Sequence, residues 1–529
     1  MKSLLFDGVA GLLAAACFSA GAQNAQHLST TQPGGMPGLP VLTGIALATN
    51  GVNITWDGPS GYYQLFQSQS LTRPKWLAVG KDTNLLRQAT VATTASNTFF
   101  RVSGPSPQYA GSQTCAECHS PILNTVAHTA HAGAFTNAAF AAKGGQTNLS
   151  CLPCHTVGAG LPTGFISLAR TPKLAAVQCE NCHGPAAGHA ANPDDPTLVP
   201  RVEVAATLCG GCHTLRYGEW KTSGHTRVIP NLNAAAQIDN CGRCHSGTAR
   251  WSLTEGQTPL AGDASLGIQC INCHDAHQTN GYPAQLIYPT ASTNDYFMPT
   301  NGVFANYYNA RINVCGQCHN DTGASWTNSA APPHLSLQYN MLLGTVGELE
   351  TPGPHYQPAS HALLLANQCV DCHMQTVTNV TPLYTNTGRS HTFTLNTAGS
   401  YLFCGKCHGI NPKNPELFKT FAQEGVSNRV EELRLDLVYW ATNWAPANLP
   451  ALFDKYGSNT WEYTAPGRLT AAGAGPNAAE QAMIPANIQK ARFNVYVVLN
   501  DRSLGIHNPD YTEELLDTAE NWIYEILYP

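Results

Sequence analysis

Hydrophobic and polar residues alternate in four short segments near the start of the chain. These segments are residues 52–56, 63–65, 76–79 and 99–102. Alternation with a period of two is typical of strands that bury one face, and the Gly, Pro and Asn residues between the segments mark turns. Several short strands at this spacing favour a small antiparallel sandwich. We therefore predict an all-β module over residues 41–103, which we expect to act as a spacer or adhesion module.

The end of the chain has the periodicity of helices instead. In residues 426–444 the apolar positions fall on one side of a helix; they are Val430, Leu433, Leu437, Val438 and Ala441. Residues 488–499 form a second apolar-periodic segment. Asn508 and Pro509 open a third helix with a capping residue and a proline in the first turn. We predict a helical C-terminal region over residues 410–529 that packs on the preceding domain.

Between these regions the sequence Cys-x-x-Cys-His occurs nine times within residues 114–409. This motif is the attachment signature of c-type haem: the two thiolates bond covalently to the porphyrin, and the histidine becomes the proximal iron ligand. The predicted attachment residues are Cys115, Cys118, Cys151, Cys154, Cys179, Cys182, Cys209, Cys212, Cys241, Cys244, Cys270, Cys273, Cys315, Cys318, Cys369, Cys372, Cys404 and Cys407. The predicted proximal ligands are His119, His155, His183, His213, His245, His274, His319, His373 and His408.

Zinc or disulfides explain this pattern less well. Structural zinc sites use pairs of Cys-x-x-Cys, but they do not require a histidine after every second cysteine. A disulfide framework has no reason to keep the spacing. We therefore predict nine covalently attached haems.

Composition sets the fold class of this haem region. Only 11% of the residues are charged, against an average of about 25%, and Gly and Pro are abundant, so porphyrin faces must supply much of the core. We predict a multidomain chain: a small all-β sandwich, then a coil-rich, mainly α multihaem cytochrome c domain with a helical C-terminal tail. The sequence has no basic stripe, so no nucleic-acid partner is expected.

The N-terminus is typical of an export signal. Lys2 precedes the apolar residues 12–18, and the small residues Ala20, Gly21 and Ala22 suit a cleavage site, so residues 1–22 are a predicted signal peptide. Cys17 lies in the removed segment or, alternatively, is a lipidated anchor. No other apolar stretch reaches about 18 residues, so no transmembrane span is expected. The predicted location is periplasmic, cell-surface or extracellular.

The histidines outside the motifs are candidates for the second axial ligand of each iron. We set aside His27, which lies close to the signal. Ten candidates remain for nine irons, and this match favours bis-histidine ligation throughout. They are His128, His131, His189, His225, His277, His334, His355, His361, His391 and His507. His128 and His355 are the candidates for the surplus.

Local context sharpens the choice. The step from His119 to His131 equals the step from His213 to His225, which favours His131 over His128. His189 and His277 follow their own motifs so closely that they cannot easily reach the opposite face of the same iron. We expect such histidines to ligate a neighbouring haem.

These stretches resemble the multihaem cytochrome superfamily that includes the tetrahaem carrier of the hydroxylamine-oxidation pathway, pentahaem nitrite reductases and octahaem hydroxylamine oxidoreductases. The resemblance runs from about residue 114 to the C-terminus and rests on residues 179–185, 212–225, 333–338, 369–374, 389–393, 490–493 and 503–509. It implies that His391 is the ligand that follows the 369–374 motif and that the helical tail delivers His507 as an axial ligand. The β module, for its part, resembles fibronectin-type-III-like modules.

Two functions remain open at this point. The first is an electron carrier with redox partner proteins: donor and acceptor cytochromes, or an outer-membrane conduit, with a homo-oligomer or filament permitted. The alternative is an oxidoreductase of the nitrite, hydroxylamine or sulfur-oxyanion type with one open iron. The chain lacks the Cys-x-x-Cys-Lys motif common in nitrite reductases, so we expect a carrier. A third reading is a binding or sensory haem protein with the β module as receptor.

Overall fold

The computed structural model divides the chain into two compact units. The first comprises residues 1–221 and 269–286, and the second comprises residues 222–268 and 287–529. The structure describes residues 41–48, 51–57, 63–69, 77–79, 88–92, 98–103, 108–161, 163–196, 198–227, 232, 237–238, 241–259, 264, 266–279, 283–287, 313–353, 355–365, 367–380, 385–395, 400–409, 413–470 and 475–529. The predicted signal peptide, with Cys17, and His27 lie outside the described residues.

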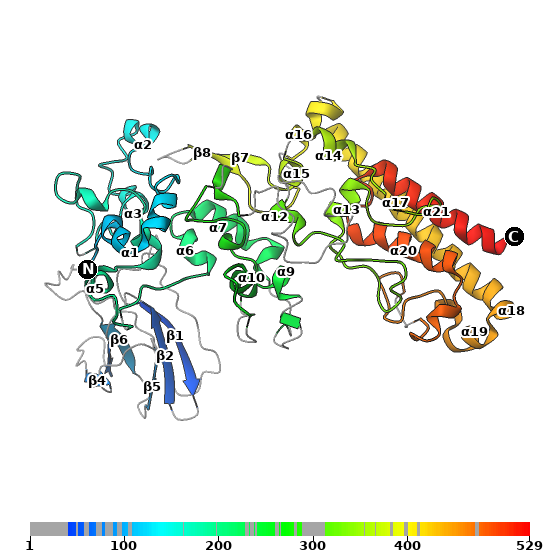
Figure 1. The fold of residues 1–529 in the computed structure, drawn as a ribbon, viewed down its shortest axis with the longest axis horizontal. Coiled ribbons are helices and arrows are strands. Elements are labelled where there is room, and N and C mark those ends of the chain that lie inside the picture. Colours follow the sequence, from blue (N-terminus) through cyan, green and yellow to red (C-terminus); the bar gives the residue numbers. More distant parts are fainter. Residues whose placement is uncertain are drawn as a thin grey trace. The chain divides into compact units, whose positions relative to one another are not determined.

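The first unit begins with two three-stranded antiparallel sheets, drawn in blue in Figure 1. One sheet has the order β1-β2-β5, with strands Val41–Ala48, Gly51–Asp57 and Gln88–Val91. The other has the order β4-β3-β6, with strands Leu77–Val79, Gln64–Ser68 and Phe99–Ser103. Ile54 and Trp56 from the first sheet share one buried cluster with Leu65 and Phe100 from the second. Small antiparallel sheets were predicted here, and they are present.

The rest of the first unit consists of short helices joined by coil. They are α1 (Ser112–Val126), α2 (Ala138–Ala142), α3 (Leu152–His155), η1 (Pro172–Leu174), α4 (Cys179–His183), α5 (Ala187–Ala191), α6 (Ala206–Gly210), α7 (Thr214–Lys221), η4 (Cys270–Asn272) and η5 (Pro283–Gln285). The motifs of this unit lie on or beside α1, α3, α4, α6 and η4. A helical turn suits the motif because residues three apart face the same side of a helix, which directs both thiols toward one porphyrin.

The second unit has the same kind of short elements before its tail. They are η2 (Gly224–Thr226), α9 (Gly242–His245), α10 (Gly247–Thr254), α12 (Asn313–Gly316), α13 (Gln338–Leu343), α14 (Ser360–Leu364), α15 (Cys369–His373), β7 (Thr376–Val380), β8 (Thr385–Arg389) and α16 (Ser400–His408). Strands β7 and β8 pair as an antiparallel hairpin that the sequence analysis did not predict. The motifs of this unit lie on α9, α12, α15 and α16.

The tail is helical, as predicted. It contains α17 (Lys413–Tyr439), a π-helical turn labelled η7 (Trp440–Trp444), α18 (Ala445–Asn448), α19 (Pro450–Tyr456), η8 (Gly457–Asn459), η9 (Gln481–Met483), α20 (Ala486–Asp501) and α21 (Pro509–Leu527). The side chain of Asn508 caps α21 by accepting a hydrogen bond from the Tyr511 amide. This is the helix start that Asn508 and Pro509 predicted.

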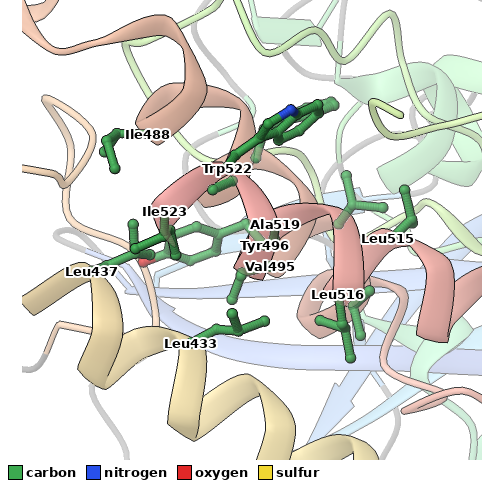
Figure 2. Close-up of a cluster of buried hydrophobic side chains, with 14 of the residues drawn as sticks. Leu433, Leu437, Ile488, Val495, Tyr496, Leu515, Leu516, Ala519, Trp522 and Ile523 are labelled. Carbon is green, nitrogen blue, oxygen red and sulfur yellow. The ribbon is translucent and has the colours of Figure 1, made fainter. Parts of the chain in front are cut away.

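The long helices bury a common apolar core. Leu433 and Leu437 of α17 pack with Val495 of α20 and with Leu516 and Ile523 of α21 (Figure 2). The buried positions on α17 recur every three or four residues, as one face of a helix requires. The same cluster includes residues of the 337–349 segment, which carries α13, so the tail packs against the motif-bearing part of its own unit. No helix among the described residues is long and apolar enough to cross a membrane.

Candidate haem sites

Six of the nine motif histidines lie opposite a histidine from elsewhere in the chain. In each pair one ring belongs to a motif and the other does not. The centroid separations are 6.1 Å for His213 with His131, 6.1 Å for His183 with His277, 6.4 Å for His319 with His225, 5.8 Å for His245 with His334, 6.0 Å for His408 with His361, and 6.3 Å for His373 with His507.

This separation fits an iron between the two rings. A histidine nitrogen lies about 2 Å from the metal ion that it binds, and the ring centroid lies about 1 Å farther out, so two rings on opposite sides of one iron are about 6 Å apart. Rings in direct van der Waals contact would be closer: His155 and Phe140 stack at 4.0 Å. The six pairs therefore leave the space that a haem iron needs.

The Nδ1 atom of many of these rings contacts an oxygen. His183 faces the carbonyl of Arg201 at 2.8 Å, and His361 faces the carbonyl of Ile506 at 3.2 Å. An oxygen acceptor holds the proton on Nδ1, which leaves Nε2 unprotonated and directed at a metal. Such outer contacts fix the ring in the orientation that ligation requires.

Burial favours the neutral form of several of the paired imidazoles. It lowers the pKa of His131, His213, His245 and His334, and it lowers the pKa of His225 to about 4. Only a neutral imidazole offers a lone pair to iron. The rings are thus in the ligating form at neutral pH.

His507 differs from these rings in its partner. Its Nδ1 lies 2.7 Å from the carboxylate oxygen Oδ1 of Asp501. Burial lowers the pKa of His507, but the Asp501 carboxylate outweighs burial and raises it overall. Gln338, whose Oε1 lies 3.0 Å from His319 Nδ1, ends the 333–338 stretch on which the resemblance rests. Neither Gln338 nor Asp501 was assigned a role from the sequence, because only the fold brings each one to its histidine.

The other three motif histidines, His119, His155 and His274, are not among the six pairs. His119 is exposed, at a kink within α1. His155 contacts the carbonyl of Ala134 through Nδ1 at 2.8 Å and stacks on Phe140. His274 contacts the carbonyl of Ala284 through Nδ1 at 2.7 Å. The Nδ1 contacts of His155 and His274 with backbone carbonyls resemble those of His183 and His361 in the six pairs.

Four of the ten candidates for the second ligand lie outside the six pairs. His128 is exposed, and its Nδ1 contacts the carbonyl of Asn124, one turn earlier in α1, at 2.7 Å. His189 lies half-buried on α5. His355 is half-buried, and burial lowers its pKa. His391 contacts the carbonyl of Arg389 through Nδ1 at 3.1 Å.

Cysteines of different motifs also meet within each unit. In the first unit, side-chain hydrogen bonds join the thiols of Cys115 and Cys179, of Cys154 and Cys212, and of Cys209 and Cys270. In the second unit they join Cys244 and Cys318, and Cys315 and Cys369. Each of these sulfurs belongs to a predicted haem motif, so attachment points of different motifs lie close together.

Glu180 is a further residue that organises the motifs. It lies inside the motif on α4, is 2% exposed, and its carboxylate accepts hydrogen bonds from the amides of Ala110, Gly111 and Ala186. It thus ties the residues that precede α1 to α4. The sequence analysis noted the pattern at 179–185 but assigned this glutamate no role.

Comparison with known proteins places part of this region in a family. Residues 114–184, which span the motifs of His119, His155 and His183, match the family model described as cytochrome c554 and c-prime. No match to a curated protein was found.

Three solved structures are similar at low identity. They are the outer cell wall cytochrome OcwA (18% identity, TM-score 0.49, covering 78% of this chain and 99% of that chain), the undecahaem cytochrome from the S-layer of Carboxydothermus ferrireducens (20%, 0.48, 80% and 70%), and the cytochrome c nitrite reductase of Desulfovibrio desulfuricans (14%, 0.35, 61% and 85%). Together with the repeated attachment motif, the family match identifies this chain as a multihaem c-type cytochrome that binds haem covalently.

Proposed function

We propose that this chain is an exported nonahaem cytochrome that carries electrons through a series of bis-histidine haems in periplasmic or extracellular respiration. The observation that carries the proposal is the set of six histidine pairs, each spaced for an iron between two imidazoles. An iron with two protein ligands has no position for a substrate. Such a site suits electron transfer rather than chemistry on a bound molecule.

The ligand assignment follows the pairs. We propose that each motif cysteine pair holds one haem and that His131, His277, His225, His334, His361 and His507 are the second ligands of the His213, His183, His319, His245, His408 and His373 sites. For the His119, His155 and His274 sites we assign no individual second ligand; His128, His189, His355 and His391 remain as candidates, with His128 or His355 as the surplus. Under this assignment the surplus is one histidine, as the sequence analysis expected.

The residues of neighbouring sites provide a path. When bound, the haems supply one-electron Fe(III)/Fe(II) couples. In the first unit, cysteine contacts link the His119 site to the His183 site, and they link the His213 site to both the His155 and the His274 sites. In the second unit they link the His245, His319 and His373 sites in a row. Helices α15 and α16, which carry the next two motifs, are in contact, and this extends the row to the His408 site.

Export follows from the predicted signal at residues 1–22 and from the site of c-type haem attachment, which lies outside the cytoplasm. The proposed partners are redox proteins: donor and acceptor cytochromes or an outer-membrane conduit. We assign the β module of residues 41–103 a spacer or adhesion role. Apolar side chains such as Ile54 and Leu65 form its buried cluster, and the module contains no cysteine or histidine.

The first test is spectroscopic. The purified ferric protein should give only low-spin electron paramagnetic resonance signals, and the reduced protein should bind no carbon monoxide, because every iron has two histidine ligands. A high-spin signal, or carbon monoxide binding at about one haem in nine, would instead favour the alternative, an oxidoreductase with one open iron.

The second test uses a matched pair of variants at His131. His131→Ala should make about one haem in nine high-spin and open it to carbon monoxide. His131→Met keeps a sixth ligand, so that haem should stay low-spin and become easier to reduce, since methionine ligation raises the potential. If His131→Ala leaves the ferric spectrum unchanged, His131 is not a ligand and the pairing rule fails.

A further inference from the structure

Asp501 stands out among the groups that surround the second-unit sites. It is the last residue of α20, at the turn that leads to α21 (Figure 1), and it is 1% exposed. Its Oδ1 lies 2.7 Å from Nδ1 of His507. Its Oδ2 accepts hydrogen bonds from the amide and the hydroxyl of Ser503. The carboxylate is therefore held rigidly, away from water, against the back of a proposed iron ligand.

Four other proposed ligands in this unit contact neutral oxygens through Nδ1. His319 faces the side-chain amide oxygen of Gln338 at 3.0 Å, and His334 faces the hydroxyl of Ser336 at 3.0 Å. His361 and His373 face backbone carbonyls at 3.2 Å and 3.4 Å. Any acceptor on Nδ1 orients the ring and raises the basicity of Nε2, and a charged carboxylate makes Nε2 a stronger donor to the iron than a neutral oxygen does.

The His373–His507 site also has a particular place in the row. The contact between Cys315 and Cys369 joins it to the His319 site, and the contact of helix α15 with α16 joins it to the His408 site. Gln338 links the first two sites a second time, because its Oε1 lies at His319 while its Nε2 donates to the backbone carbonyl of Asp501. The carboxylate thus acts on an interior site with a neighbour on each side.

We propose that Asp501 is a positioning residue that makes the His373–His507 site the hardest to reduce in the row of His319, His373 and His408 sites, an inference that rests on the ligand assignment proposed above. A stronger donor and a nearby buried negative charge both stabilise Fe(III) over Fe(II). Each transfer moves one electron from a ferrous iron to the adjacent ferric iron, with no bond formed or broken and no proton moved. The interior site then stays oxidised while its neighbours fill, so passage through it limits the rate along the row.

Asp501→Asn tests this directly in the full holoprotein. Asparagine keeps the size and the acceptor oxygen but removes the charge. In a redox titration followed by optical and paramagnetic resonance spectra, the reduction equilibrium constant of one low-potential haem should rise about tenfold, which is 59 mV for a one-electron couple. All haems should stay low-spin, and the g-values of that haem should change.

Two further variants make the result decisive. Ser503→Ala removes a donor to the carboxylate, leaves more negative charge facing His507, and should shift the same haem in the opposite direction. Asp371→Asn removes a buried charge from the same motif, where Asp371 pairs with Arg389 at 2.9 Å. It should leave the g-values unchanged because Asp371 has no contact with the axial ring among those described.

Unchanged potentials in Asp501→Asn would overturn the inference, as would a haem that turns high-spin, since the carboxylate would then only hold the ring in place. The proposed function fails separately, on a high-spin signal in the unmodified protein.

Discussion

Replacing Glu180 with glutamine should weaken the contact between helix α4 and the residues that precede α1. The carboxylate is 2% exposed. Its Oε1 accepts from the amides of Ala110 at 3.0 Å and Ala186 at 2.8 Å, and its Oε2 accepts from the amide of Gly111 at 2.8 Å. Glutamine has the same shape, but it is uncharged and has one oxygen rather than two.

The magnitude follows from these bonds. A hydrogen bond to a charged group contributes about 1.5–3 kcal/mol, and a neutral one contributes about 1 kcal/mol. The two bonds at Oε1 should therefore each weaken by about 1 kcal/mol. The bond from Gly111 is lost, because the glutamine amide points a donor at a donor, and this costs about 1–3 kcal/mol. We expect the free energy of unfolding of this unit to fall by about 3–5 kcal/mol, a large part of the 5–15 kcal/mol typical of a domain.

Hydrogen exchange measured by mass spectrometry gives a local test. Peptides that contain Ala110, Gly111 and Ala186 should lose protection in Glu180→Gln, while peptides from α20 should keep it. The matched control is Glu431→Gln on α17, where the exposed Glu431 pairs with Arg434. That change should cost about 0.5 kcal/mol or less. Equal protection in both variants would show that the three bonds to Glu180 contribute little and that the contacts of Cys115 with Cys179 hold the segments together instead.

Three other outcomes are expected. Leu437→Ala removes a fully buried side chain from the core of the tail and should lower the free energy of unfolding by about 2–5 kcal/mol. Guanidinium unfolding followed by far-ultraviolet circular dichroism should show a lower midpoint, and an unchanged midpoint would contradict the packing in Figure 2. Of His128→Ala and His355→Ala, one should produce a high-spin haem and the other should not, because one position remains for these two histidines; two silent variants would leave an iron open. Asn508→Ala should destabilise the tail by about 1–3 kcal/mol, since Asn508 caps α21 and its amide donates to the carbonyls of Met341 and Gln357; full thermal stability would refute this.

The sequence predicts best what is determined locally. The apolar positions of α17 recur with helical spacing, so its buried face could be read from Val430, Leu433 and Leu437, and the start of α21 could be read from Asn508 and Pro509. The hairpin of β7 and β8 was missed. Its strands are rich in Thr and Asn and lack the apolar alternation on which the prediction of strands depends.

The sequence does not show which motif histidine each candidate ligand faces. His131 and His225 follow their own motifs at the same offset, which marks both as candidate ligands, yet His131 faces His213 and His225 faces His319. The offset marks a histidine as a candidate ligand, but the fold decides which motif it meets. Sequence alone could therefore supply the candidates and their number, while the pairs required coordinates.

The pairs also explain how a chain of this composition holds its shape. The hydrophobic cluster that the tail helices form is much larger than the hydrophobic clusters near the haem motifs of either unit. In the motif regions, coordination takes over part of the role of a core: under the proposed assignment each iron joins two segments that are far apart in sequence, such as α15 and the turn before α21 at His373 and His507. A ligand that crosses to another motif's iron also fixes the spacing between neighbouring sites, which tunnelling between them requires. Under the proposed assignment, the histidine–iron bonds both stabilise the motif regions and fix the distances between neighbouring sites. Loss of one such ligand should therefore lower the stability of the fold and slow electron transfer.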